Sequence, residues 1–65
     1  MTNSQKLKAE VIRNGLTQKE LANKLGISFQ SLNMKINNKR QFKASEISEL
    51  SKILNIANVN EIFFA

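Results

Sequence analysis

Apolar residues recur along this chain at helical spacing, in five short stretches separated by polar residues and glycine. Leu21, Ala22 and Leu25 fall on one side of a helix. Ile47, Leu50 and Leu54 repeat the pattern further along, and the same spacing predicts that Glu46, Glu49 and Lys52 lie on the outside of that helix. With no proline and two glycines in 65 residues, an all-helical structure is favoured. We predict one all-α domain over residues 1–65, with helices at about residues 5–14, 18–25, 29–37, 44–54 and 59–64.

The first predicted helix has Ser4 as its expected N-cap. Leu7, Val11 and Ile12 are its expected inward residues. Gly15 follows at the position where a left-handed residue ends a helix. We interpret this helix as scaffold.

The second and third predicted helices meet at a single glycine. Thr17 and Glu20 have the spacing of a capping box, which starts the second helix at about Gln18. Gly26 suits its left-handed end, and Ser28 suits the N-cap of the next helix. Helix, short turn centred on glycine, helix: this arrangement is typical of a helix-turn-helix unit.

At these positions the chain resembles the family of phage repressors and Cro proteins, and the resemblance extends from about Leu7 to Phe64. The matching residues are Leu16, Thr17, Gln18, Glu20, Leu21, Ala22, Gly26, Ile27, Ser28 and Leu32. The resemblance implies a compact five-helix, lambda-repressor-like domain that binds double-stranded DNA sequence-specifically, with its third helix in the major groove. It also implies a Cro-like or repressor-type regulator of transcription, from a phage or a mobile element.

The net charge of +5 is unevenly distributed. Residues 46–65 carry three glutamates and one lysine, whereas residues 21–45 carry five basic side chains and no acid. This basic block covers the third predicted helix and the loop after it, where a polyanion would bind. The alternative, that a small basic domain is simply well solvated, stays open at this point.

The third predicted helix carries our candidates for base reading. Gln30, Asn33 and Asn37 project to the side opposite Leu32, and side-chain amides can hydrogen-bond base edges, including adenine bidentately. Phe29 is consistent with either the core or a thymine methyl contact, and Met34 has the same ambiguity. The full candidate set is Ser28, Phe29, Gln30, Asn33, Met34 and Asn37.

Phosphate contacts are expected on both sides of this helix. Gln18 and Lys19 begin the second helix, whose free amides suit a phosphate oxygen. The stem of Lys35 is expected along the edge of the core, with its ammonium reaching solvent or phosphate. Asn38 stands where the family usually has glycine, and asparagine also tolerates the left-handed conformation. The full candidate set is Gln18, Lys19, Lys35, Asn38, Lys39, Arg40 and Lys43.

Composition excludes several other functions. The chain has no cysteine, histidine or aspartate, so it offers no disulfide, ordinary zinc site or catalytic triad. We expect no enzymatic activity, cofactor, metal or small-molecule substrate. No apolar run approaches the roughly 20 residues that span a membrane. We therefore expect a cytoplasmic protein of a bacterial cell, associated with the nucleoid.

One recognition helix gives too few base contacts for useful specificity, so we expect a homodimer, formed either in solution or on DNA. One of Phe63 and Phe64 is expected to close the core and the other to be a dimer contact. Without a second domain, a Cro-like regulator is favoured over a two-domain repressor, unless the chain is an excised fragment. The competing hypothesis is an antirepressor or other protein-binding module that uses this fold to sequester a regulator.

Overall fold

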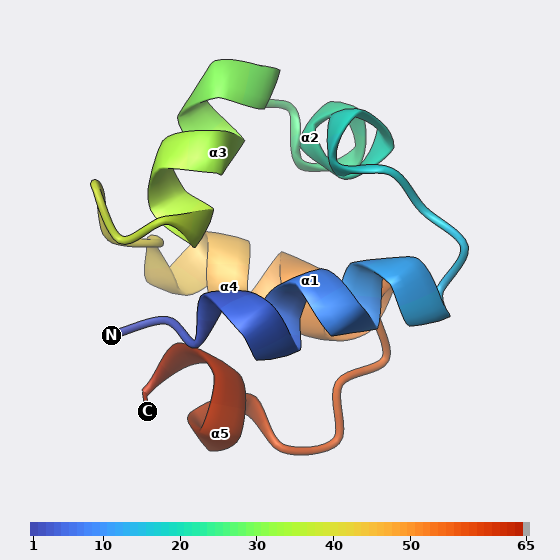
Figure 1. The fold of residues 1–65 in the computed structure, drawn as a ribbon, viewed down its shortest axis with the longest axis vertical. Coiled ribbons are helices and arrows are strands. Elements are labelled where there is room, and N and C mark those ends of the chain that lie inside the picture. Colours follow the sequence, from blue (N-terminus) through green and yellow to red (C-terminus); the bar gives the residue numbers. More distant parts are fainter. Residues whose placement is uncertain (65) are drawn as a thin grey trace.

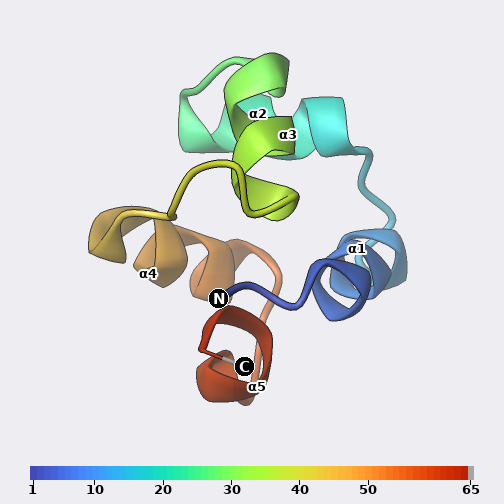
Figure 2. The ribbon, with the colours of Figure 1, turned by 60° about the vertical axis from the view of Figure 1, so that its left-hand side comes forward.

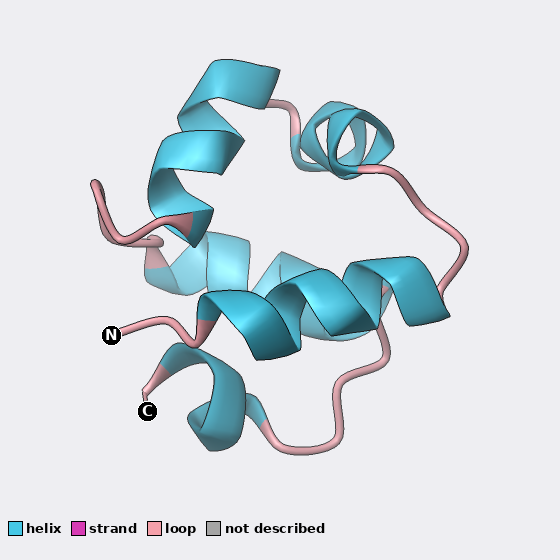
Figure 3. Ribbon diagram, viewed as in Figure 1, coloured by secondary structure: helices cyan, strands magenta, loops and turns pink. Residues whose placement is uncertain are grey.

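A computed structural model describes residues 1–64, and this part of the chain contains five helices and no strand (Figures 1 and 3). The all-α, five-helix prediction is confirmed. The helices are α1 (Ser4–Arg13), α2 (Gln18–Leu25), α3 (Phe29–Ile36), α4 (Ala44–Ile53) and α5 (Val59–Phe63). None of them is long and apolar enough to cross a membrane.

At the starts of α1 and α2, a side chain accepts a hydrogen bond from a backbone amide three residues later and so caps the helix. In α2, Thr17 Oγ1 accepts from the Glu20 amide at 3.1 Å, and Glu20 Oε1 accepts from the Thr17 amide at 3.0 Å, so the capping box is present. The expected cap of α1 was wrong by one residue. Asn3 Oδ1 accepts from the Lys6 amide at 3.1 Å, while the Ser4 hydroxyl donates to the Ile36 carbonyl and joins α1 to the end of α3.

Four helices end on a residue with positive φ. Gly15 and Gly26 have φ of 69° and 73°, and Asn38 and Asn55 have 61° and 52°. After each of them the next amide returns to a carbonyl five residues earlier, as in Ile27 to Ala22 at 3.1 Å. This is the Schellman ending, which satisfies carbonyls that would otherwise have no partner.

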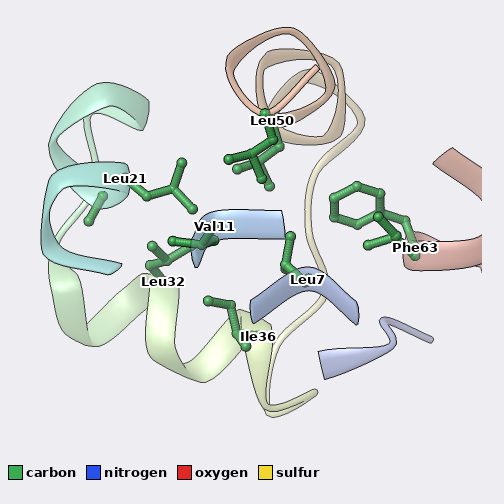
Figure 4. Packing of buried hydrophobic residues seen from close by; sticks show 10 residues of the cluster. Leu7, Val11, Leu21, Leu32, Ile36, Leu50 and Phe63 are labelled. Atoms are coloured by element: carbon green, nitrogen blue, oxygen red, sulfur yellow. The ribbon is translucent and has the colours of Figure 1, made fainter. Parts of the chain in front are cut away.

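The core is built from all five helices (Figure 4). It centres on leucine and isoleucine side chains that are fully buried, namely Leu7, Leu21, Leu32, Ile36, Leu50 and Leu54. Phe63 is also buried and meets the ring of Phe42 edge-on, with centroids 5.5 Å apart. Phe63 is therefore the aromatic that closes the core, and it is not available as a dimer contact. Ile12 does not face inward as expected, because its side chain is 75% exposed.

The helices form two groups. α2 and α3 pack on one another at one end of the molecule, and α1, α4 and α5 lie beneath them (Figures 1 and 2). The N-terminal segment runs beside α5, where the Asn3 amide donates to the Ile62 carbonyl at 2.6 Å. The other three helices therefore pack against one side of the α2–α3 pair, and the opposite side of the pair faces solvent.

Candidate nucleic-acid interface

The outer face of α3 is polar and open to solvent. Ser28 caps the helix by accepting from the Ser31 amide at 3.0 Å, and Leu32 and Ile36 bury its inner face. This packing directs Gln30, Asn33 and Asn37 outward, and all three are exposed. Three of the predicted base-reading side chains therefore lie together on one face.

The two ambiguous apolar positions of α3 differ in burial. Phe29 is 51% exposed, so of its two alternatives the core one is wrong, and the residue lies at the surface at the start of the helix. Met34 is half-buried. Ser28 is exposed, although its hydroxyl is already used as a cap.

Three side-chain amides form a chain of hydrogen bonds between α2 and α3 that the sequence did not predict. Gln18 Nε2 donates to Asn33 Oδ1 at 3.1 Å. Asn37 Nδ2 donates to the Asn33 backbone carbonyl at 2.9 Å and to Asn33 Oδ1 at 3.2 Å. The only sequence signal was that Asn33 and Asn37 are one helical turn apart. The contact of Asn33 with Gln18 could not be predicted in this way, because it depends on the angle at which α2 and α3 cross.

Exposed basic side chains flank this face. Lys39, Arg40 and Lys43 lie between α3 and α4, on residues 37–43, which we call the basic segment. Lys19 lies in the first turn of α2. Among residues 1–64, none of these four cations forms an ion pair. Within residues 1–64, none of these four cationic groups is therefore held by a carboxylate at ion-pair distance.

Lys35 does not reach toward a phosphate, and this correction has a clear physical cause. The side chain is 8% exposed, and its Nζ lies 2.5 Å from Glu46 Oε2 of α4. Glu46 is buried with it, although the sequence placed this glutamate on the outside of its helix. A buried ammonium needs a charged partner, and Glu46 supplies it.

Glu46 also holds the start of α4. Its Oε1 accepts from the Lys43 amide at 2.8 Å, which joins the end of the basic segment to the same carboxylate. Burial opposes ionisation of Glu46, but the hydrogen bonds from the Lys35 ammonium and the Lys43 amide, with the attraction of both lysines, outweigh it. The pKa of Glu46 therefore lies below its usual value.

Asn38 likewise has a different partner from the one we expected. Its Oδ1 accepts from the Thr2 amide at 2.9 Å, and its Nδ2 donates to the Thr2 carbonyl at 2.9 Å. The side-chain amide therefore holds the N-terminal segment against the end of α3, and its proposed contact with a phosphate stays a prediction.

Comparison with family models found a match to a family described as helix-turn-helix, over residues 7–57 of the 65. The matched range contains α2, α3, the basic segment and α4, together with most of α1. Comparisons with curated proteins and with solved structures gave no match.

Proposed function

The chain belongs to the helix-turn-helix family of DNA-binding regulators, that of the lambda repressor and Cro, and on this premise we propose that α3 reads base edges in the major groove. The observation that carries the proposal is the polar face of α3, where Gln30, Asn33 and Asn37 are exposed together. Phe29, exposed at the start of the same helix, suits a thymine methyl. Ser28 and Met34 border this face and complete the base-reading set.

The basic segment supplies the contacts to the DNA backbone in this proposal. Lys39, Arg40 and Lys43 are exposed and unpaired within residues 1–64, as is Lys19. Gln18 sits at the first position of α2, where free backbone amides favour a phosphate oxygen. If the three cations of the segment neutralise three phosphates, affinity falls with salt at a log–log slope of roughly −3 per subunit.

The biological role that fits this interface is a Cro-like or repressor-type switch of transcription, in a phage or another mobile element. A symmetric homodimer on two half-sites supplies the specificity that one recognition helix lacks. Phe64 is the proposed dimer contact, because its ring is 63% exposed. It lines a hollow of about 210 Å³ together with Met1, Phe42 and Ile47.

Two variants test the division between base reading and backbone binding. Gln30→Ala is expected to weaken binding to a selected duplex by roughly 5- to 100-fold, because one amide-to-base pairing is lost, and to leave binding to random duplex almost unchanged. Arg40→Ala is expected to weaken both alike, since phosphate contacts carry no sequence information. Electrophoretic mobility shift titrations at two salt concentrations measure both effects.

Two results would contradict the proposal. If Gln30→Ala lowers the affinity for selected and random duplex equally, Gln30 does not contact base edges in the major groove. If the chain does not bind random duplex at low salt, the proposed DNA-binding function is wrong, because contacts with the DNA backbone alone give measurable non-specific affinity at low salt.

A further inference from the structure

The orientation of the amide chain on α3 is fixed by one backbone group. The carbonyl of Asn33 can only accept hydrogen bonds, and Asn37 Nδ2 lies 2.9 Å from it. Asn37 must therefore direct its amide nitrogen toward Asn33. The same nitrogen lies 3.2 Å from Asn33 Oδ1, so its second hydrogen is donated there.

The amide of Asn33 is fixed in turn. Its Oδ1 accepts from Asn37 Nδ2 and, at 3.1 Å, from Gln18 Nε2. Rotating the Asn33 amide by half a turn would place its NH₂ group against that of Asn37, donor against donor. Even if Gln18 turned to offer its own oxygen, two hydrogen bonds would be lost and one gained. Asn33 thus keeps its oxygen toward its neighbours.

This arrangement leaves Asn33 as a donor only. Its Oδ1 is occupied, whereas no residue within 1–64 accepts from its Nδ2. In the major groove guanine presents two acceptors, N7 and O6, and thymine presents one. Adenine requires a donor and an acceptor together, and cytosine presents a donor. The free group of Asn33 therefore matches guanine and does not match bidentate pairing with adenine.

We propose that Asn33 is a specificity-determining residue that reads guanine, because Gln18 and Asn37 hold its amide with the donor group outward. The inference rests on the proposed function, since it requires α3 to lie in the major groove. It departs from the general expectation that an asparagine there pairs with adenine. Gln30 is the contrasting case, because no hydrogen bond to another residue of 1–64 fixes its exposed amide, so it can turn to suit either purine.

The test begins with a duplex that the wild-type chain selects from a random pool. Each base pair of this duplex is then replaced in turn by the other three, and the affinity for each resulting duplex is measured. At one base pair, the wild-type protein is expected to prefer guanine over adenine by about tenfold. Asn33→Ala is expected to abolish the preference at that pair alone, whereas the matched variant Gln30→Ala preserves it. Replacing that guanine by 7-deazaguanine, which lacks the N7 acceptor, should weaken DNA binding by the wild-type protein and leave binding by Asn33→Ala unchanged.

The possible failures are distinct. A preference for adenine at the pair that depends on Asn33 would overturn the inference and leave base reading by α3 intact. No change at any pair with Asn33→Ala, with an unaltered circular dichroism spectrum, would show that Asn33 reads no base. A wild-type chain that binds no duplex at low salt would instead overturn the proposed function, and the inference with it.

Discussion

At the scale of single residues, the buried pair Lys35–Glu46 is a charged contact within the core of the fold. Both side chains are buried, and they join α3 to α4 beneath the proposed DNA-binding face. Breaking a buried ion pair leaves one charge without compensation, which costs more than the pair itself contributes. The pair therefore fixes the position of the basic segment, whose last residue, Lys43, is bound to the same carboxylate.

Glu46→Gln is expected to lower the free energy of unfolding at pH 7 by roughly 3 kcal/mol, because it leaves the Lys35 ammonium buried and unpaired. The pKa of Glu46 lies below its ordinary value of 4.5 in the folded chain, so its charge stabilises the fold above that pH. This contribution is lost as the pH falls through the lowered folded-state pKa. The difference between wild type and variant should therefore be large at pH 7 and smaller at pH 3, as measured by urea unfolding.

Two further variants make this result interpretable. Glu49→Gln, on the exposed side of α4, should change stability by less than about 0.5 kcal/mol at either pH. The double variant Lys35→Met with Glu46→Leu removes both charges and should recover most of the lost stability. An equal deficit of Glu46→Gln at pH 3 and pH 7 would contradict the role given to the charge.

At the scale of elements, the sequence predicted the helix starts and ends that depend on residues close together in the chain. Thr17 with Glu20, Gly26 and Ser28 are local signals, and the structure uses each of them as expected. It did not predict partners that are distant in sequence. Glu46 was placed outside α4 because helical spacing cannot show which residue of another helix lies opposite, and Lys35 is eleven positions away in the chain. The Gln18–Asn33 contact was missed for the same reason.

Asn38 ends α3 and also holds the N-terminal segment, and these roles can be separated. Asn38→Gly keeps a residue that tolerates φ of 61° and removes both hydrogen bonds to Thr2. We expect faster hydrogen exchange at the Thr2 amide, no change at the Lys39 amide, which donates to Met34 at 2.8 Å, and a stability loss of about 1 kcal/mol or less.

The matched variant Asn38→Ala loses the same hydrogen bonds and adds the strain of a left-handed alanine, about 1 to 2 kcal/mol. It should therefore be the less stable of the two and should also expose the Lys39 amide to exchange. If glycine proves as destabilising as alanine, the contacts with Thr2 carry the stability of this helix end and the left-handed turn does not.

At the scale of the whole molecule, the dimensions are compatible with a dimer on DNA. Half-sites one helical turn apart are separated by about 34 Å, so each recognition helix must lie about 17 Å from the two-fold axis. The domain measures 25 × 24 × 20 Å, and α3 and α5 lie at opposite ends of it (Figure 1). We expect the two-fold axis to pass beside Phe64, with both copies of α3 facing the same side of a duplex.

Phe64→Ser tests this arrangement, because an exposed ring contributes little to the folded monomer and much to an apolar contact between copies. We expect unfolding free energy within about 0.5 kcal/mol of wild type, and unchanged affinity for a duplex with one half-site. On a duplex with two half-sites, the steep wild-type binding curve should become that of independent sites. Ile12→Ser, which removes another exposed apolar side chain, is the control and should keep the steep curve. Retention of cooperative binding by Phe64→Ser would place the dimer contact elsewhere on the surface.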